Sequence, residues 1–286
     1  MSAPAYVLSL TCPDGPGIVH AVTGVLADLG GNISDSQQFG DPDTGRFSMR
    51  VQVHFPQAAG VDAAALREAF APVAASFAMD WQVDVLGRRL RTLVMVSRAG
   101  HCLNDLLFRQ RSGLLPIEVP AIVGNHADLA PLADFYGAPF HHVPVAPDTR
   151  EAADDRLLGL VADLDVELVV LARYMQILSP RLCEALAGRA INIHHSFLPS
   201  FKGARPYAQA HERGVKIIGA TAHYVTADLD EGPIIEQDVQ RVTHAMDVAQ
   251  LQAIGQDVEA QVLARAVRWH AEHRVLLDGH RTVVFA

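Results

Sequence analysis

Cysteine is scarce in this sequence, and the few cysteines present are widely spaced. The 286 residues include only Cys12, Cys102 and Cys183. An odd number at such spacing encodes neither a disulfide framework nor a thiolate zinc site. The first residues also lack the basic and apolar stretches of a signal peptide. We therefore expect a protein of a reducing compartment, the cytoplasm.

Basic clusters and long apolar runs are missing as well. Only Arg88, Arg89 and Arg91 lie close together, and the formal net charge is −9, which disfavours a nucleic-acid partner or an anionic membrane surface. Apolar runs such as 93–96 and 168–172 are far shorter than the roughly 18 residues of a membrane span. Half of the residues are hydrophobic and 19% are charged, so the composition is that of a globular chain.

Alternation with a period of two dominates the first 86 residues. Apolar side chains recur at every second position over 47–55 and again over 79–85, which is typical of strands with one covered face. Two amphipathic helices are expected between the strands, over 18–29 and from about 62 to 77. The order βαββαβ predicts a ferredoxin-like sandwich over residues 1–86.

The strands change character in the second part of the chain. Continuous apolar runs at 93–96, 121–123 and 168–171 indicate strands that are buried on both faces, as in a parallel sheet. Helical stretches are expected near 102–112, 128–136 and 149–164, and a long final helix near 251–269. We therefore expect a second, α/β domain over residues 92–286, after a linker at 87–91.

Polar side chains gather in two segments of this second domain. A strand over residues 191–194 would direct Asn192 and His194 to one face. A second strand, near residue 224, is followed by an acidic loop that contains Asp230. Open α/β sheets build their sites at the carboxyl ends of strands, and a carboxylate there can orient a histidine or hold a water. The pattern predicts an enzyme with an Asn/His/Asp site and indicates acyl chemistry.

Other interpretations of these residues stay open. The chain has 14 histidines, so a histidine beside a polar loop is often structural, and the acidic loop can be a solvated turn. A metal site from His194, His195 and His223 is a sharper alternative. Adjacent strand residues point to opposite faces, however, and no HExxH motif is present. A dinucleotide site is not expected, because the residues after strand 93–96 contain one glycine and no GxGxxG.

Two long motifs resemble a known family. The segments 191–203 (INIHHSFLPSFKG) and 219–237 (GATAHYVTADLDEGPIIEQ) are similar to those of the folate-dependent formyltransferases, among them glycinamide ribonucleotide transformylase and methionyl-tRNA formyltransferase. The resemblance runs from about residue 91 to the end and implies a Rossmann-like formyltransferase domain with a mostly parallel sheet. It also implies that Asn192, His194 and Asp230 are the catalytic residues.

The resemblance further implies where the substrate binds. The stretch 173–178 matches the one whose backbone holds the pterin in this family. The implied substrate-binding residues are Arg173, Met175, Gln176, Ile177 and Leu178, with His223 in the same pocket in a role that is not assigned.

Within this group the whole chain looks most like the formyltetrahydrofolate deformylases, which hydrolyse 10-formyltetrahydrofolate to tetrahydrofolate and formate. Its N-terminal domain resembles an ACT domain, which plain transformylases lack. Ser196 and Phe197 follow His195 where transformylases usually have a proline, and Ala204-Arg205-Pro206-Tyr207 comes next. The loop 98–104 has one glycine where a transformylase has a glycine-rich loop for the phosphate of its amine acceptor.

The resemblance therefore implies water as the nucleophile, with formate supplied for purine biosynthesis. Asn192 and His194 would stabilise the oxyanion, while Asp230 would orient His194 and position or deprotonate the water. The folate is the substrate, and neither a metal nor a bound cofactor is expected. The alternatives are a transferase to an amine such as glycinamide ribonucleotide, a metallohydrolase and a non-catalytic sensor.

A turn in the N-terminal domain is a candidate effector site. Asp14, Gly15, Gly17 and Ile18 belong to a turn that opens the first helix, with Pro16 suited to an initial helical position. Free N–H groups at such an end favour a carboxylate, for example that of a small amino acid. An ordinary tight turn is the alternative. ACT-like domains usually pair edge to edge, so we also expect a homo-oligomer.

Overall fold

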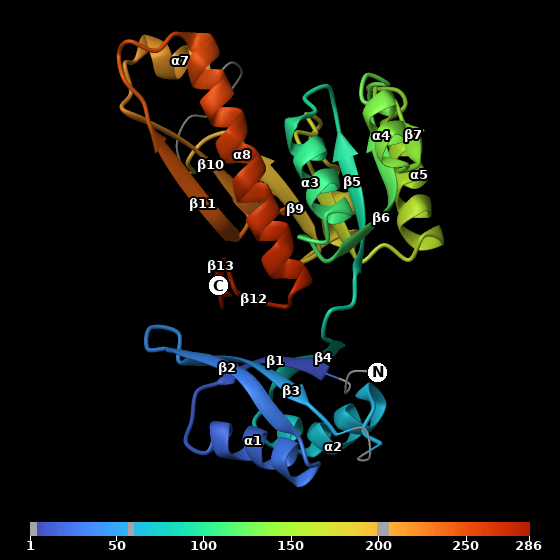
Figure 1. The fold of residues 1–286 in the computed structure, drawn as a ribbon, viewed down its shortest axis with the longest axis vertical. Coiled ribbons are helices and arrows are strands. Elements are labelled where there is room, and N and C mark those ends of the chain that lie inside the picture. The colour runs from blue at the N-terminus through green and yellow to red at the C-terminus, as the bar shows by residue number, and fades with distance from the viewer. Residues whose placement is uncertain (1–4, 57–59, 199–205) are drawn as a thin grey trace. The chain divides into compact units, whose positions relative to one another are not determined.

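The computed structural model describes residues 5–56, 60–198 and 206–286 (Figure 1). It divides into two compact units, each described separately below. The first unit comprises Met1–Arg88, Glu272–Asp278 and Thr282–Ala286, and the second comprises Arg89–Ala271 and Gly279–Arg281. From the sequence alone, all residues from 92 onward are expected in the second domain. The structure instead groups most of the last fifteen residues with the N-terminal unit.

The first unit is built on a four-stranded antiparallel sheet. Its elements are β1 (Ala5–Pro13), α1 (Ile18–Asp28), β2 (Asn32–Asp41), β3 (Arg46–His54), α2 (Ala63–Ser76) and β4 (Asp80–Val85). The strand order in the sheet is β2-β3-β1-β4, and all three pairings are antiparallel. The βαββαβ order predicted from the alternating pattern is confirmed.

Apolar side chains at alternate strand positions place the helices on one face of this sheet. Leu8, Met49 and Val53 are fully buried in one cluster with Ile18 of α1 and Phe70 of α2. The Asp62 side chain accepts a hydrogen bond from the Ala65 N–H and so caps the N-terminus of α2. The start of α1 differs from the expectation. Gly17, with φ of 91°, precedes the first helical residue, so Pro16 lies outside the helix.

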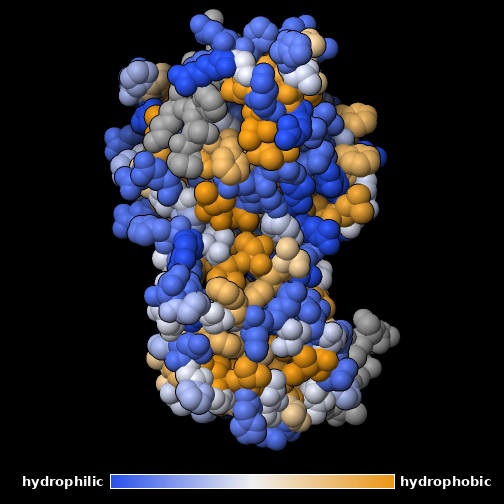
Figure 2. Space-filling model, turned by 90° about the vertical axis from the view of Figure 1, so that its left-hand side faces the viewer, coloured by the Kyte–Doolittle hydropathy of each residue, from blue (hydrophilic) through white to orange (hydrophobic). Residues whose placement is uncertain are grey.

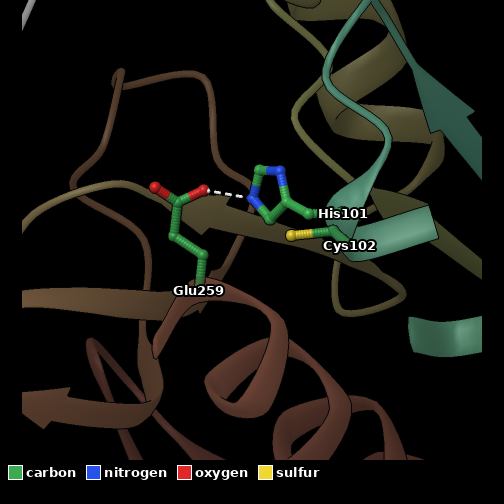
Figure 3. A group of neighbouring side chains, drawn as sticks. All are labelled: His101, Cys102 and Glu259. Atoms are coloured by element: carbon green, nitrogen blue, oxygen red, sulfur yellow. Dashed lines mark hydrogen bonds and ion pairs between the residues drawn. The ribbon is translucent and has the colours of Figure 1, made fainter. Parts of the chain in front are cut away.

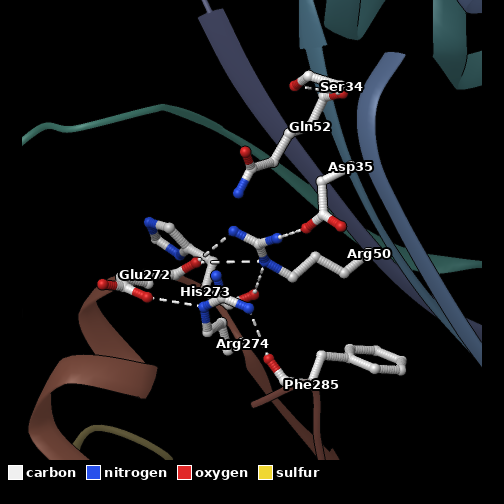
Figure 4. A network of polar contacts seen from close by, with 8 residues as sticks. All are labelled: Ser34, Asp35, Arg50, Gln52, Glu272, His273, Arg274 and Phe285. Atoms are coloured by element: carbon white, nitrogen blue, oxygen red, sulfur yellow. Dashed lines mark hydrogen bonds and ion pairs between the residues drawn. The ribbon is translucent and has the colours of Figure 1, made fainter.

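The opposite face of the sheet carries a buried arginine that binds the end of the chain (Figure 4). Arg50 is fully buried and donates from its Nε to the His273 carbonyl over 3.1 Å and from NH2 to the Glu272 carbonyl over 3.0 Å. Its NH1 donates to the Asp35 carboxylate over 2.9 Å. The hairpin of β12 (Val275–Asp278) and β13 (Arg281–Val284) follows. These bonds explain why the end of the chain is grouped with the first unit. The grouping was not predicted, because a contact across about 220 residues leaves no local pattern in the sequence.

The second unit is an α/β domain with a seven-stranded sheet. Its elements are β5 (Leu90–Val96), α3 (His101–Arg111), β6 (Ile117–Gly124), α4 (Ala130–Tyr136), β7 (Phe140–His142), α5 (Arg150–Asp163), β8 (Leu168–Leu171), α6 (Pro180–Ala185), β9 (Ala190–His194), α7 (Pro206–Glu212), β10 (Ile217–Tyr224), β11 (Ile234–Arg241) and α8 (Val248–Ala271). β5 begins at Leu90, so the last two residues of the expected linker 87–91 already belong to this strand.

The sheet is mostly parallel, as predicted. The order is β11-β10-β9-β8-β5-β6-β7, with parallel pairings from β9 through β7 and antiparallel pairings of β10 with both of its neighbours. Residues of α5 and α6 share one apolar cluster with β5, β6 and β8, while α8 packs against β9, β10 and β11. Both faces are therefore covered, which explains the continuous apolar runs.

The chain reverses its winding direction at β5. After β5 it moves outward through β6 and β7, then returns to place β8 on the other side of β5. The loops that leave the carboxyl ends of β5 and β8 therefore diverge, and a crevice at such a switch point is the usual ligand site of an open α/β sheet. This reversal positions the residues described in the next section.

β11 forms one outer edge of the seven-stranded sheet. Ile234 and Val239 are exposed on it, among the charged residues Glu236, Asp238 and Arg241. Figure 2, which faces this side, shows hydrophobic patches interrupted by hydrophilic ones. Charges on an edge strand discourage pairing with a further strand. Within the described ranges, no helix combines the length and apolarity that a bilayer crossing requires.

Candidate active site

One cavity brings together every residue that the motifs assign to the second domain. It has a volume of about 230 Å³ and lies at the carboxyl ends of β8 and β9. Its lining includes Asn192, His194, Asp230, His223, Arg173, Met175, Gln176, Ile177 and Leu178. The strand, the acidic loop and the stretch 173–178 are far apart in the sequence, and the sheet places them around a single site.

Asn192 and His223 form a pair on neighbouring strands. β9 and β10 are antiparallel with Asn192 opposite His223, and Asn192 Nδ2 lies 3.2 Å from His223 Nε2. His223 Nδ1 lies 2.9 Å from the Tyr224 carbonyl, which can only accept. The proton of His223 is thus on Nδ1, and Nε2 accepts from the Asn192 amide. Burial lowers the pKa of His223, which favours this neutral form. His223 therefore orients Asn192, leaving the second amide proton of Asn192 for a ligand.

His194 and Asp230 form a second pair. His194 Nδ1 lies 3.2 Å from Asp230 Oδ1, and the side chains are 7% and 15% exposed. The hydrogen bond from His194 lowers the pKa of Asp230 against the opposing effect of burial, so the carboxylate stays charged at neutral pH. Asp230 has a φ of 59°, a conformation that non-glycine residues seldom adopt. The pair leaves His194 Nε2 as the nitrogen available to a ligand.

His195 lies closer to His194 than the alternating strand pattern predicts. The two rings stack with centroids 4.8 Å apart and planes inclined by 24°. The expectation that they point to opposite faces is wrong, because β9 ends at His194 and the alternation stops there. Burial, followed by the charges of Arg173 and His194, lowers the pKa of His195 to about 4. His195 is therefore neutral at physiological pH.

The loop after β8 is held by two side chains from other elements. The Met175 N–H donates to Ser97 Oγ over 2.9 Å, and Arg150 NH1 donates to the Ile177 carbonyl over 3.0 Å. These two backbone groups are therefore engaged within the protein, and a ligand would use other groups of the loop. The side chains of Met175 and Ile177 are 60% and 59% exposed at the cavity. They offer an apolar surface to a flat ring system.

A buried carboxylate behind the cavity was not predicted from the sequence (Figure 3). Glu259 of α8 is 1% exposed and lies 2.7 Å from His101 Nε2, 2.5 Å from the Tyr207 hydroxyl and 3.4 Å from Arg173 Nε. The position of Glu259 along the helix was the one signal in the sequence that could have indicated its burial. Glu259 follows Leu251 by eight residues and precedes Val262 by three, so it lies on the apolar face of α8.

The same carboxylate belongs to a group with the composition of a metal site. Within the described ranges, His101, Cys102 and Glu259 are the one such group, with their ligand atoms all within 4.8 Å of one another. Burial raises the pKa of the Cys102 thiol well above its ordinary value, so this sulfur is a poor cation ligand. The guanidinium of Arg173 and the Tyr207 hydroxyl already occupy the carboxylate. The cluster is therefore better described as a carboxylate held by His101, Tyr207 and Arg173.

The candidate effector residues lie together in the first unit. Asp14, Gly15 and Gly17 are exposed in the turn between β1 and α1, whereas Ile18 is buried at the start of α1. The Asp14 N–H donates to the Gly45 carbonyl over 2.8 Å, which ties this turn to the β2–β3 turn.

Comparison with known proteins identifies the family. The profile described as "Formyl transferase" matches residues 90–267, and the one described as "ACT domain" matches residues 6–69. A formyltetrahydrofolate deformylase of Corynebacterium sp. strain P-1 is 53% identical over 279 residues, covering 98% of this chain and 97% of that protein. The chain belongs to the formyltetrahydrofolate deformylase family.

Solved structures separate the deformylases from the transformylases. The crystal structure of a formyltetrahydrofolate deformylase from Burkholderia mallei has a TM-score of 0.94 and 49% identity, over 99% of this chain and all of that one. A glycinamide ribonucleotide transformylase from Symbiobacterium toebii has a TM-score of 0.66 and 32% identity, over 71% of this chain and 97% of that one. The transformylase thus matches only part of the deformylase chain. Residues 199–205, which complete the first motif and begin the segment after it, lie outside the described residues.

Proposed function

We propose that the protein hydrolyses 10-formyltetrahydrofolate to tetrahydrofolate and formate. Family membership supports this reaction, and one structural observation carries it. Within one cavity, Asn192 is held by His223 and His194 is held by Asp230. An amide donor and an imidazole nitrogen thus face the same space, which is the arrangement that hydrolysis of an acyl C–N bond requires.

The arrangement supports the following steps. Water attacks the formyl carbon and gives a proton to His194 Nε2, while Asp230 stabilises the resulting imidazolium through Nδ1. The carbonyl oxygen becomes an oxyanion that accepts a hydrogen bond from the second Nδ2–H of Asn192. His194 then returns the proton to N10 of the folate as the C–N10 bond breaks. Tetrahydrofolate leaves with formic acid, which ionises to formate. No metal or bound cofactor takes part.

The loop 173–178 supports the position of the folate. Met175 and Ile177 present apolar side chains beside the catalytic pairs. The pterin would pack on these side chains, with N10 towards His194. Burial raises the pKa of the neighbouring Tyr174 to about 12, so this side chain stays neutral.

Dependence on an amine acceptor tests the reaction. Formate release should occur with water as the only acceptor, at a rate unchanged by added glycinamide ribonucleotide. A transferase must exclude water, which is present at about 55 M. The loop that would cradle a phosphate contains a single glycine, Gly100, with a φ of −99° that any residue can adopt, so it is not the glycine-rich loop with which a transformylase holds the phosphate of its acceptor. Turnover that appears only with the amine would replace the deformylase assignment by a transformylase.

The ACT domain match supports a regulatory role for the first unit. We also propose that the protein is a cytoplasmic homo-oligomer that supplies formate for purine synthesis. The turn at Asp14–Ile18 would bind the carboxylate of a small amino acid. Calorimetry of the full chain with glycine, methionine and the other amino acids tests this binding, and light scattering tests the oligomer. No heat with any amino acid would leave the unit a purely structural role.

A further inference from the structure

Arg173 is a largely buried cation, and two of its donor atoms have no hydrogen-bond partner among the residues that the structure describes. It follows β8 directly, has a φ of 62°, and its side chain is 17% exposed. Among the described residues, neither its Nε nor its NH1 has a hydrogen-bond partner, although both atoms are buried. Glu259 Oε2 is 3.4 Å from Nε, which makes an ion pair without a hydrogen bond. Buried polar groups are nearly always hydrogen-bonded, so these donors point to a ligand.

The unused donors meet the catalytic histidine at the same cavity. Arg173, His194 and His195 all line it. The Nε2 atoms of both histidines are buried and also have no partner among the described residues. His194 is more than nine-tenths buried. The charge of Arg173 is felt at the His195 ring, which stacks on His194. One cationic side chain and two histidines therefore line the same cavity, each with a buried polar atom that has no partner among the described residues.

We infer that Arg173 forms a subsite for the formate product beside His194, with Glu259 holding the guanidinium in position. This inference rests on the proposed hydrolysis, in which the formyl group is neutral before the reaction. Water adds its oxygen to the formyl carbon, the C–N10 bond breaks, and one proton of water goes to N10. The other proton is lost when formic acid ionises. A monoanion thus arises in the cavity that Arg173 lines, and a guanidinium N–H without a partner is a strong, charge-assisted donor to a carboxylate oxygen.

Glu259 limits how strongly Arg173 can hold the anion. Its carboxylate is shared among Arg173, His101 and Tyr207, and the hydrogen bonds to His101 and Tyr207 are shorter than the contact with Arg173. The negative charge of Glu259 opposes a second anion on the same guanidinium. Glu259 is therefore a positioning residue that keeps the product subsite weak enough for release.

Formate binding to the full-length protein, without folate, tests the subsite. Saturation-transfer NMR on the formate proton gives the Kd for the wild type and for Arg173→Gln, Arg173→Lys and Glu259→Gln. Arg173→Gln should raise the Kd at least tenfold, equivalent to about 1.4 kcal/mol, and Arg173→Lys should raise it less. Glu259→Gln should lower the Kd several-fold, because the competing charge is gone. Arg181→Gln, an exposed arginine of α6 paired with Asp155, is the control and should leave the Kd unchanged.

The inference can still be tested if one variant fails to fold. Two different Arg173 variants are measured, and Glu259→Gln is expected to change the Kd in the opposite direction. A purely structural role would weaken binding in both Arg173→Gln and Glu259→Gln, and that result would overturn it. Equal formate binding by the wild type and Arg173→Lys and Arg173→Gln, or none by the wild type, would also overturn it. Because no turnover is measured, a protein that binds formate through Arg173 but does not release it from the folate would contradict the proposed function alone.

Discussion

At the scale of single residues, the proposed mechanism depends most on the charge of Asp230. Asp230→Asn keeps the volume but removes the charge that stabilises the imidazolium of His194. We expect kcat to fall by about 10²-fold or more, the usual contribution of an acid–base group, with the unfolding midpoint little changed. Glu231→Gln, an exposed neighbour in the same loop, is the control. If Asp230→Asn retained a rate within about threefold, under roughly 1 kcal/mol, the role of Asp230 would be wrong.

His195 links stability to pH. Its pKa in the folded protein is about 4, below the ordinary value of about 6.5. Between these values the unfolded chain binds the extra proton, so this contribution to stability is complete above pH 6.5 and is lost as the pH falls towards 4.

We therefore expect the urea midpoint of His195→Asn to decline less than that of the wild type between pH 7.5 and 4.5. His223, whose pKa is also lowered, keeps part of the decline in both proteins. His20→Asn, on the exposed face of α1, should follow the wild type. Parallel curves for His195→Asn and the wild type would mean that His195 does not titrate as described.

Some residues of the site could be predicted from the sequence and others could not, for physical reasons. Strand alternation predicts Asn192 and His194 on one face, the acidic loop supplies Asp230, and a family motif contains all three. The role of His223 required the β9–β10 register, which no local pattern contains. The role of Glu259 could not be predicted from the sequence of α8 alone. Its partners Arg173, His101 and Tyr207 come from three other segments of the chain, and only the fold places them beside this carboxylate.

At the scale of elements, α7 and α8 meet at a glycine. A Cβ on Gly255 would overlap the Tyr207 ring and hydroxyl, the group that bonds Glu259. Gly255→Ala should therefore destabilise the protein, even though alanine favours helix by about 1 kcal/mol. Gly159 in α5 is the matched control, because a Cβ there meets nothing within 4 Å, so Gly159→Ala should stabilise by about 0.5–1 kcal/mol. Urea unfolding measures both, and a stabilised Gly255→Ala would contradict this packing.

Elements were predicted best where one periodicity held over several turns. The helices expected at 102–112, 149–164 and 251–269 match α3, α5 and α8 within three residues at each end. The predicted linker boundary was less accurate. Leu90 and Arg91 were assigned to the linker, although Leu90 is buried and its N–H donates to the Pro116 carbonyl. A strand boundary of this kind depends on its partner strand.

At the scale of the whole molecule, the last residues complete the first unit. Deleting residues 272–286 removes two carbonyl acceptors of Arg50 and leaves Asp35 as its ionic partner. We expect this to destabilise the first unit by about 3–6 kcal/mol, because each of the two lost hydrogen bonds to a charged group contributes about 1.5–3 kcal/mol. Trp81 of β4, which packs edge-on to Phe70, reports its unfolding by fluorescence in a Trp269→Phe background.

A double-mutant cycle separates the charge from the packing. Arg50→Met should destabilise the full chain but cost much less, or stabilise, in the shortened chain, because an apolar side chain needs no acceptors. The control is Arg67→Met, whose guanidinium donates to the Val83 carbonyl within the same unit and should cost the same in both chains. An equal cost of Arg50→Met in both chains would show that the tail does not act through Arg50.

The contact between Arg50 and the tail also fixes an order of events during synthesis. Arg50 leaves the ribosome 222 residues before Glu272, a delay of roughly 11–44 s at about 5–20 residues per second. During that interval the nascent sheet carries a guanidinium that must stay hydrated, so the N-terminal unit cannot reach its final packing ahead of the catalytic unit. The part of the protein that is translated first is thus finished last, and a ribosome stalled before residue 272 would present an N-terminal sheet that proteases can still open.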